Sequence, residues 1–295
     1  MTGPNIAQPI SNNEFEIFVL SKPYFDATGL LVAVDDDSGR IAGFTHCGFG
    51  PADPDRFCRQ LDQSLGTIAI VCSAGNAAMD DALIQAGIKY LREKGADVIY
   101  GGGRFPLTPF YWGLYGGSEF SGVLESQPEV QAAMMRNGLK ESARSVLFEF
   151  NLAKAEPRHI KNIVLKRESQ LMILDDDLPG GAWLALAIEA FHPIRVELQD
   201  RSGRQKVASS ALWPMALFGR REGCSRIGLI DVEVDQAYRR RGFGRLLVTE
   251  SIKCAMEQSY DILAVQTDAT NSAAIKLYES MGFVRTETAS LYRLE

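Results

Sequence analysis

One order of predicted elements occurs twice in this chain, and this repeat constrains the fold more than any other feature of the sequence. Each half contains a predicted β-hairpin whose turn combines Asp, Ser and Gly, at residues 36–40 and again at residues 200–204. In each half the hairpin is followed by an apolar strand, a long helix, a second strand that opens on Asp97 or Asp261, and a shorter helix. We therefore predict a mixed α/β fold made of one duplicated unit.

The two copies are predicted to meet in a charged stretch that contains Pro157. We divide the chain there into a first copy, residues 1–152, and a second copy, residues 153–295. In the first copy the patterns predict strands at residues 15–20, 67–72, 96–100 and 145–150, and helices at residues 77–94 and 127–137. In the second copy they predict a hairpin within residues 194–213, a strand at residues 227–234 and a helix at residues 246–256. Asn76 is the expected N-cap of the first long helix.

Charge and composition limit the partners of the chain. Its 295 residues carry 31 Lys and Arg against 37 Asp and Glu, which gives a formal net charge of −6. General nucleic-acid binding needs a basic surface, so we expect no nucleic-acid partner. No apolar run approaches the length of a membrane span, so we expect no membrane partner either.

The cysteines and the first residues favour a cytoplasmic location. Five cysteines are an odd number and none forms a Cys-x-x-Cys pair, which fits a reducing compartment better than a disulfide framework. The N-terminal residues lack the basic and apolar regions of a signal peptide. The three histidines have no partners at metal-ligand or triad spacing, so we expect no metal site.

A strand, a glycine-containing loop and a helix follow one another between residues 227 and 256. This order places backbone N–H groups at a helix N-terminus, where the aligned peptide dipoles favour an anion. Gly242 and Gly244 let a ligand approach the backbone, and four arginines add positive charge. The pattern predicts a pyrophosphate site. The alternatives are a basic surface patch or an RNA-contacting arm, although such arms are usually disordered tails of basic chains.

Two motifs in the second copy resemble those of the GNAT superfamily of acetyl-CoA-dependent acyltransferases. The segment Arg239-x-x-Gly242-x-Gly244 resembles motif A of that family, written Gln/Arg-x-x-Gly-x-Gly/Ala. The segment from Asn271 to Phe283 resembles its motif B, written Asn-x-x-Ala-x-x-Leu-Tyr-x-x-x-Gly-Phe. The duplication is similar to the tandem GNAT arrangement of mycothiol synthase-like enzymes. The resemblance implies two tandem GNAT-like domains, each a twisted mixed β-sheet flanked by helices.

The resemblance also implies that acetyl-CoA is the co-substrate and that no metal takes part. Backbone N–H groups of the glycine loop would hold the pyrophosphate, and the preceding strand would run beside the pantetheine. In the family, a backbone N–H at a bulge in this strand polarises the thioester carbonyl, and the matching position here is Val234. Asn271 is expected to cap the helix that follows it. The implied cofactor-binding residues are Val232, Val234, Arg239, Arg240, Arg241, Gly242, Phe243, Gly244, Arg245 and Asn271.

Tyr278 is the general acid that the resemblance implies, because it would return a proton to the departing thiolate. An unperturbed Tyr and a thiol differ by about 1.5 pKa units, so full transfer would cost only roughly 2 kcal/mol. The alternative is that Tyr278 is a core residue, since it shares a helix face with Ala274 and Met281.

The general base is less clearly marked than the general acid. Family bases often project from positions that Gly228 and Ile230 hold here, and neither can accept a proton. Asp231 and Glu233 alternate to the other face of the strand. Glu233 is our first choice because a β-bulge could turn it toward the acceptor. The alternatives are a solvated salt bridge for Glu233, a water relay to a more distant carboxylate, and binding of an already neutral amine.

The first copy lacks the charge pattern of the second. Residues 73–81 stand at the place of the arginine–glycine loop and contain no arginine, while Asp80 and Asp81 would repel a pyrophosphate. Met134 stands at the place of Tyr278. We therefore predict that the first copy is degenerate and non-catalytic. Its aromatic block, Phe110, Tyr111 and Trp112, is expected in the core or an interface, with a lining of the acceptor cleft as the alternative.

The resemblance therefore implies an N-acetyltransferase that moves an acetyl group directly from acetyl-CoA to a primary amine of a small molecule or peptide. One alternative is a non-catalytic CoA-binding sensor or interaction module. Covalent catalysis by Cys224 or Cys254 is a weaker alternative, because neither cysteine has a His partner in the sequence.

Overall fold

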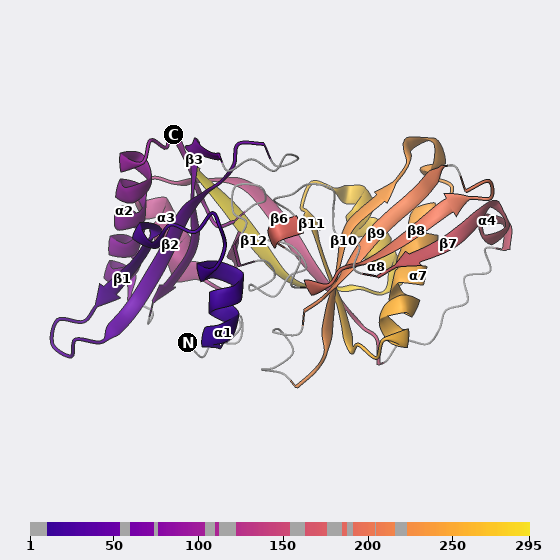
Figure 1. The fold of residues 1–295 in the computed structure, drawn as a ribbon, viewed down its shortest axis with the longest axis horizontal. Helices are drawn as coiled ribbons and strands as arrows, with labels where there is room; N and C mark the ends of the chain where they lie inside the picture. Colours follow the sequence, from indigo (N-terminus) through magenta and orange to yellow (C-terminus); the bar gives the residue numbers. More distant parts are fainter. Residues whose placement is uncertain are drawn as a thin grey trace.

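A computed structural model shows how the two copies are arranged (Figure 1). It describes residues 11–53, 60–73, 76–103, 110–111, 122–153, 163–175, 185–187, 191–203, 205–215 and 223–295. Within these ranges, no helix has both the length and the apolar character needed to cross a membrane.

The first copy begins with a short helical segment, α1 (Asn12–Phe15) followed by the π-helix η1 (Glu16–Leu20). The strand predicted at residues 15–20 is therefore wrong. Ser11 and Glu14 form a capping box, in which each side chain accepts a hydrogen bond from the backbone N–H of the other, at 3.3 Å and 2.7 Å. This box satisfies two N–H groups at the helix start and outweighs the β-type residues that follow.

The rest of the first copy follows the predicted order. Its elements are η2 (Ala27–Gly29), β1 (Leu30–Val34), β2 (Ile41–Pro51), β3 (Leu61–Ser73), α2 (Ala77–Glu93), β4 (Val98–Gly101), β5 (Val123–Leu124), α3 (Pro128–Arg136) and β6 (Lys140–Asn151). Asn76 caps α2 as predicted, since its side chain accepts a hydrogen bond from the N–H of Ala78 at 3.0 Å.

The second copy repeats this order and confirms the predicted duplication. Its elements are α4 (Ile163–Glu168), β7 (Ser169–Leu174), β8 (Ile194–Asp200), β9 (Lys206–Pro214), β10 (Arg226–Val234), η4 (Gln236–Tyr238), α7 (Phe243–Glu257), β11 (Ile262–Asp268), α8 (Ser272–Met281) and β12 (Val284–Leu294). In both copies a hairpin leads to a strand, a long helix, a parallel strand, a shorter helix and a final strand.

The described strands of both copies join in one 12-stranded mixed sheet, in which the final strands are exchanged. The order is β1-β2-β3-β4-β12-β6-β11-β10-β9-β8-β7, with β5 against β12. The final strand of the second copy, β12, pairs with β4 of the first, while β6 of the first copy pairs with β11 of the second. The two exchanged strands also pair with each other, antiparallel, at the centre. Figure 1 shows the yellow β12 running into the part of the molecule built by the first copy.

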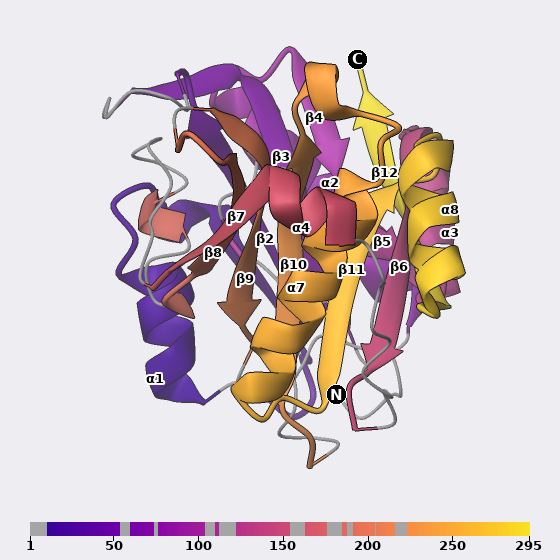
Figure 2. The same cartoon turned by 90° about the vertical axis from the view of Figure 1, so that its right-hand side faces the viewer.

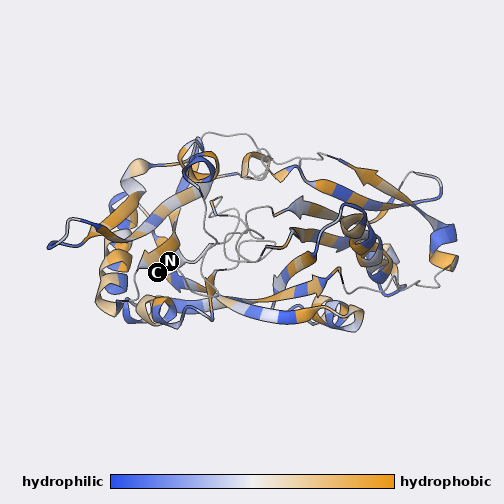
Figure 3. Cartoon of the chain, turned by 90° about the horizontal axis from the view of Figure 1, so that it is seen from below, coloured by the Kyte–Doolittle hydropathy of each residue, from blue (hydrophilic) through white to orange (hydrophobic). Residues whose placement is uncertain are grey.

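The structure confirms the predicted mixed α/β fold with helices packed on the sheet. The boundary between residues 152 and 153 stays a prediction. The helix α7 packs against β9 and β10 (Figure 2). Helices such as α7 and α8 carry hydrophobic and hydrophilic residues side by side along their turns, as amphipathic helices do (Figure 3). Two buried clusters lie beneath the helices, and each includes residues of the exchanged strand, Phe148 of β6 in one and Tyr292 of β12 in the other. A third cluster joins the copies and contains Tyr24 and Phe110 from the first and Trp213 and Ile230 from the second.

Because each copy supplies a strand to the other, we expect neither copy to be stable alone. Residues 153–295 without β6 would expose the facing edges of β11 and β12, and such edges promote aggregation. Co-expression of residues 1–152 and 153–295 should give a soluble complex of the two fragments, measured by size-exclusion chromatography and circular dichroism against the intact chain. A folded monomer of residues 153–295 alone would contradict this dependence.

Candidate active site

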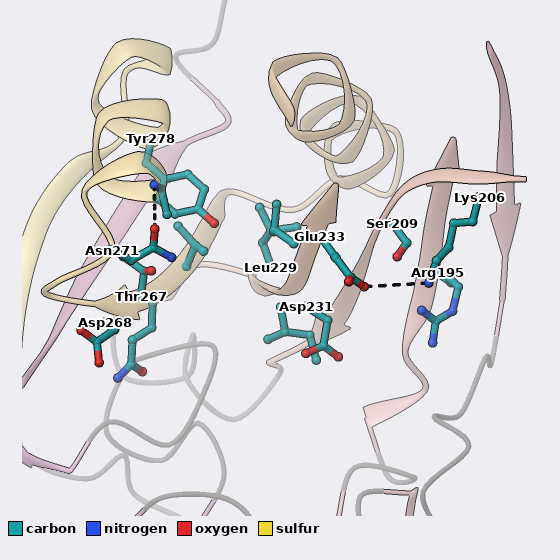
Figure 4. A pocket seen from close by; sticks show the side chains of 15 residues that line it. Arg195, Lys206, Ser209, Leu229, Asp231, Glu233, Thr267, Asp268, Asn271 and Tyr278 are labelled. Carbon is teal, nitrogen blue, oxygen red and sulfur yellow. Dashed lines mark hydrogen bonds and ion pairs between the residues drawn. The ribbon is translucent and has the colours of Figure 1, made fainter. Parts of the chain in front are cut away.

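The strands β10 and β11 form a fork that opens a polar cavity. They pair in parallel from Arg226 to Leu229 and from Ile262 to Val265, and they separate beyond that point. A cavity of about 520 Å³ lies at the opening (Figure 4). Its lining residues are Arg195, Lys206, Ser209, Leu229, Ile230, Asp231, Val232, Glu233, Val265, Gln266, Thr267, Asp268, Asn271, Ala274 and Tyr278. Four of the predicted site residues, Val232, Glu233, Asn271 and Tyr278, are therefore brought to one cavity.

A β-bulge interrupts β10 at the edge of this cavity. The pairing with β9 shifts register between Ile230 and Glu233, so that Asp231 and Val232 lie opposite a single residue of β9. Asp231 has a φ of 51°, in the left-handed region that few residues other than glycine adopt. The resemblance matched the bulge to Val234, and the structure places it earlier in the strand.

The bulge changes which side chains of β10 lie on each face of the sheet. Before it, Leu229 belongs to the buried cluster beneath α7 and α8, and after it Val232 and Val234 pack against that same cluster. Ile230 belongs instead to the cluster that joins the copies, on the other face of the sheet. Side chains alternate along a strand, so the extra residue turns Glu233 to the face of Ile230. A β-bulge is therefore present before Glu233, while the orientation of Glu233 toward an acceptor and its catalytic role stay predictions.

Two carboxylates from β10 meet the cavity in different surroundings. The side chain of Glu233 is 65% exposed, and its Oε2 lies 3.9 Å from Nζ of Lys206, an ion pair of small energy. Asp231 is in contact with solvent, yet the protein around its carboxyl removes enough water to raise its pKa. The positive charge of Arg195 lowers that pKa and the negative charge of Glu233 raises it.

Tyr278 is buried on α8 and reaches the cavity with its hydroxyl. Only 3% of the residue is exposed, and its ring centroid lies 5.4 Å from that of Phe283 and 5.9 Å from that of Phe148 on β6. In Figure 4 the hydroxyl points toward β10. Asn271 caps α8, as predicted, by accepting a hydrogen bond from the N–H of Ala274 at 3.2 Å. The ring therefore has the packing of a core residue while its polar end faces the site.

The loop before α7 leaves the N-terminus of that helix open. Gly242 is the N-cap and has a φ of 98°, and Arg240 has a φ of 58°. Left-handed residues in such a turn direct successive backbone N–H groups to one side, which is the geometry of an anion-binding nest. No side chain caps the first turn of α7, so the N–H groups of Phe243, Gly244 and Arg245 have no partner within the helix.

Three of the four arginines stabilise this loop. Nε of Arg239 donates a hydrogen bond to the carbonyl of Val234 at 2.9 Å, which fixes the end of β10. Arg241 pairs with Glu168 at 2.8 Å and lies over the rings of Tyr238 and Phe243.

Arg245 donates a hydrogen bond to Oγ of Ser280 at 2.6 Å and so links α7 to α8. Within the described part of the chain, Arg240 has no hydrogen bond or ion pair from its side chain. The sequence predicts all four arginines as cofactor-binding. In the structure the other three side chains already have partners in the protein, so Arg240 is the one whose charge remains available for a ligand.

Phe243 and Gly244, which were also predicted to bind the cofactor, can contribute to binding only through their backbone N–H groups. Phe243 is 1% exposed and its ring stacks edge-on against Tyr238, with centroids 5.6 Å apart. A methyl group added at Gly244 would lie 3.6 Å from both Leu277 and Val234, an ordinary contact distance. Val234 thus packs beside Gly244 and does not line the cavity.

The corresponding loop of the first copy leads into α2, and the N-terminus of this helix differs from that of α7. The side chain of Asn76 occupies the N-terminus of α2. Asp80, in the first turn, is 1% exposed, and its carboxylate makes no hydrogen bond to any described residue. Met134 is fully buried at the place of Tyr278. These contacts fit a degenerate first copy, which stays a prediction.

Of the remaining candidates from the sequence, Phe110, Tyr111 and Cys254 are not among the residues that line the cavity. Phe110 and Tyr111 are core residues, and Trp112 lies outside the described residues. His46 is also buried, with Nδ1 2.8 Å from the hydroxyl of Tyr111, and burial lowers its pKa to about 4. Burial raises the pKa of the Cys254 thiol, which makes it a poor nucleophile.

The described residues include no group of three or more His, Cys, Asp and Glu arranged to hold a metal. Among the cavity residues that were not predicted from the sequence are Arg195 and Gln266. Their only signal was a polar residue near the end of a predicted strand, and many surface residues share that feature.

Comparisons with known proteins agree with this geometry. Residues 204–283 match the family model described as acetyltransferase (GNAT) family. N-alpha-acetyltransferase 30 of Xenopus laevis is 43% identical over 61 residues, which are 21% of this chain and 22% of that protein. The chain therefore spans about a fifth of the length of this relative.

Solved structures share the fold over most of the chain. A tandem GNAT protein from the clavulanic acid biosynthesis pathway has a TM-score of 0.63 at 10% identity, covering 88% of this chain and 80% of that one. A glucosamine N-acetyltransferase region of a fungal multi-domain beta-N-acetylglucosaminidase also has a TM-score of 0.63, at 18% identity, covering 89% of this chain and 32% of that one. At these identities the likeness concerns the fold alone.

Substitution of the two loop glycines should separate loop stability from anion binding. Gly242→Ala forces a side chain into a left-handed conformation and should cost about 1 kcal/mol of unfolding free energy, together with a loss of CoA affinity of roughly tenfold or more. Gly244→Ala has room for its methyl group and should leave the melting temperature unchanged or higher. Calorimetric titration with CoA gives both affinities. Full CoA affinity in both variants would contradict the assignment of the loop before α7 as the binding site of the CoA pyrophosphate.

Proposed function

We propose, from the match of residues 204–283 to the acetyltransferase (GNAT) family model, that the protein is an N-acetyltransferase that transfers an acetyl group from acetyl-CoA to a primary amine. One observation carries the proposal. The fork between β10 and β11 gathers Tyr278 and the carboxylates of Asp231 and Glu233 around one cavity, and the strand that carries both carboxylates leads directly into the open N-terminus of α7.

The loop before α7 fits the pyrophosphate of CoA. The N–H groups of its nest and of the first helical turn supply donors, and the helix dipole adds about half a positive charge. Arg240 adds a mobile charge, while Arg239, Arg241 and Arg245 keep the loop in shape. Asn271 contributes by holding the start of α8, which brings Tyr278 to the fork.

Groups of the protein would then act one after another in acetyl transfer. Acetyl-CoA supplies the acetyl group as a thioester. The backbone N–H groups at the bulge, near Val232, and at Val234 would donate to the carbonyl oxygen as charge develops on it. A C–N bond forms as the C–S bond breaks, the amine proton passes to the carboxylate pair of Glu233 and Asp231, and Tyr278 donates a proton to the thiolate.

A primary α-amine of a peptide is the acceptor class that we propose first. The similarity to N-alpha-acetyltransferase 30 supports it, and the carboxylates of Asp231, Glu233 and Asp268 at the cavity favour a cationic amine. The test is turnover of acetyl-CoA, followed by thiol release, against a tetrapeptide with a free N-terminus, the same peptide N-formylated, an N-formylated peptide with a lysine side chain, and glucosamine. Turnover of the free peptide but not its N-formylated form supports the proposal. Binding of acetyl-CoA without turnover of any amine would favour the sensor alternative.

The same calorimetry tests the division of labour between the copies. We propose that only the second copy binds CoA, because the side chain of Asn76 already occupies the helix end in the first copy and Asp80 stands in its first turn. A stoichiometry of one CoA per chain is expected. Two tight sites per chain would contradict a degenerate first copy.

The acid and base assignments predict distinct changes in the rate. Tyr278→Phe keeps the buried ring and loses the proton donor, so kcat should fall on the order of 100-fold while the melting temperature changes little. Unchanged turnover would reject Tyr278 as the acid.

The pH profile identifies the base. A carboxylate accepts a proton only when ionised, so the rate should fall as the pH drops through the raised pKa of Asp231. Asp231→Asn and Glu233→Gln should each lower kcat/KM, and the variant that removes this acidic limb marks the base. Ionising Asp231 is disfavoured by burial in the folded state, so Asp231→Asn should not lower stability at neutral pH. An unaltered acidic limb in both variants would point to a base elsewhere.

A further inference from the structure

Gln266 is the first residue of β11 after the last residue that pairs with β10. The last pair of the two strands joins Leu229 to Val265, so Gln266 stands where β11 leaves β10, across from Ile230 and Asp231. Val265 belongs to the buried cluster beneath α7 and α8, and the next side chain along the strand faces the other way. Gln266 therefore lines the cavity at the point where the strands separate.

The side-chain amide of Gln266 is hydrogen-bonded at one end, and at the other end its oxygen is buried without a partner among the described residues. Its Nε2 donates a hydrogen bond to Oγ of Ser145 at 2.6 Å. The residue is 7% exposed, and its Oε1 has no hydrogen-bond partner among the described residues. Folded proteins seldom leave a buried acceptor unsatisfied, because this costs about 1–3 kcal/mol. A bound donor at the cavity would satisfy it.

The residue that orients Gln266 comes from the first copy. Ser145 lies on the exchanged strand β6, in register with Asp268 of β11, and is therefore a diagonal neighbour of Gln266. The end of β11 is fixed to the same strand, since the N–H of Ala269 donates to the carbonyl of Arg144 at 2.8 Å. The first contact fixes the Nε2 end of the amide to β6, and the second fixes the end of β11 to the same strand.

We propose that Oε1 of Gln266 accepts a hydrogen bond from the acceptor amine, and that Ser145 is the positioning residue for this contact. An amine ready to attack has N–H donors and one lone pair. An acceptor oxygen at the fork takes one N–H and directs the lone pair toward the carbonyl carbon. This inference rests on the proposed acetyl transfer, and it makes the first copy a contributor to the site through β6.

The test compares matched variants with the amine of the panel above that the protein acetylates best. Gln266→Met keeps the size and removes the oxygen, so KM for the amine should rise roughly tenfold, as expected for one lost hydrogen bond. Gln266→Glu keeps an acceptor oxygen and should retain most of the activity. Ser145→Ala should raise KM for the amine about fivefold, and Ser145→Thr, which keeps the hydroxyl, should restore it.

Two controls separate positioning from general damage to the sheet. Ser142→Ala removes another hydrogen bond of β6, from Oγ of Ser142 to the carbonyl of Leu291 at 3.0 Å, at a distance from the cavity residues, and should leave KM for the amine unchanged. The affinity for CoA, measured by calorimetry, should be the same in all these variants. Unchanged KM in Gln266→Met, an equal loss in Ser142→Ala, or a matching loss of CoA affinity would overturn the inference while leaving acetyl transfer intact. A wild-type protein that acetylates no amine would overturn both.

Discussion

The antiparallel pairing of β6 with β12 is the interaction on which the rest of this structure depends. It places a strand of the first copy beside β11, where Phe148 packs against Tyr278 and Ser145 binds Gln266. Glu149 of the same strand forms an ion pair of 2.6 Å with Arg226 at the start of β10. Arg226 is 6% exposed, so removing one partner would leave a buried charge without compensation, at a cost of about 3–5 kcal/mol. The fork of the second copy thus rests on side chains from the first.

The bulge in β10 decides what the fork can do. Without the extra residue, Glu233 would lie on the face of Leu229, beneath the helices, and the cavity would lose one of its carboxylates. The same bulge holds Asp231 in a left-handed conformation where partial burial raises its pKa. Strain of this kind persists where surrounding structure enforces it, and here the flanking pairs with β9 do so.

Local patterns were enough to predict most elements of the fold and four of the residues that line the cavity, Val232, Glu233, Asn271 and Tyr278. The Asn76 and Asn271 caps, the repeated order of elements and the arginine–glycine loop depend on residues close together in the sequence, so their signals are readable. The helix at residues 12–20 was missed because the Ser11–Glu14 box was overlooked beside an apolar run. The strand exchange was not predictable from periodicity, since β6 and β12 carry the same pattern whichever copy they join. Gln266 was not predicted either, because its partner Ser145 is far away in the sequence.

The exchange also sets an order of events during synthesis on the ribosome. The strand β4 is complete at Gly101, but its neighbour β12 begins only at Val284. At elongation rates of about 5–20 residues per second, the edge of β4 waits for roughly 10 to 40 s before its partner emerges. During that time the first copy has an open edge that another nascent chain could pair with. A duplicated chain built in this way gains a shared sheet, and its first copy keeps an unpaired edge until its last strand is made.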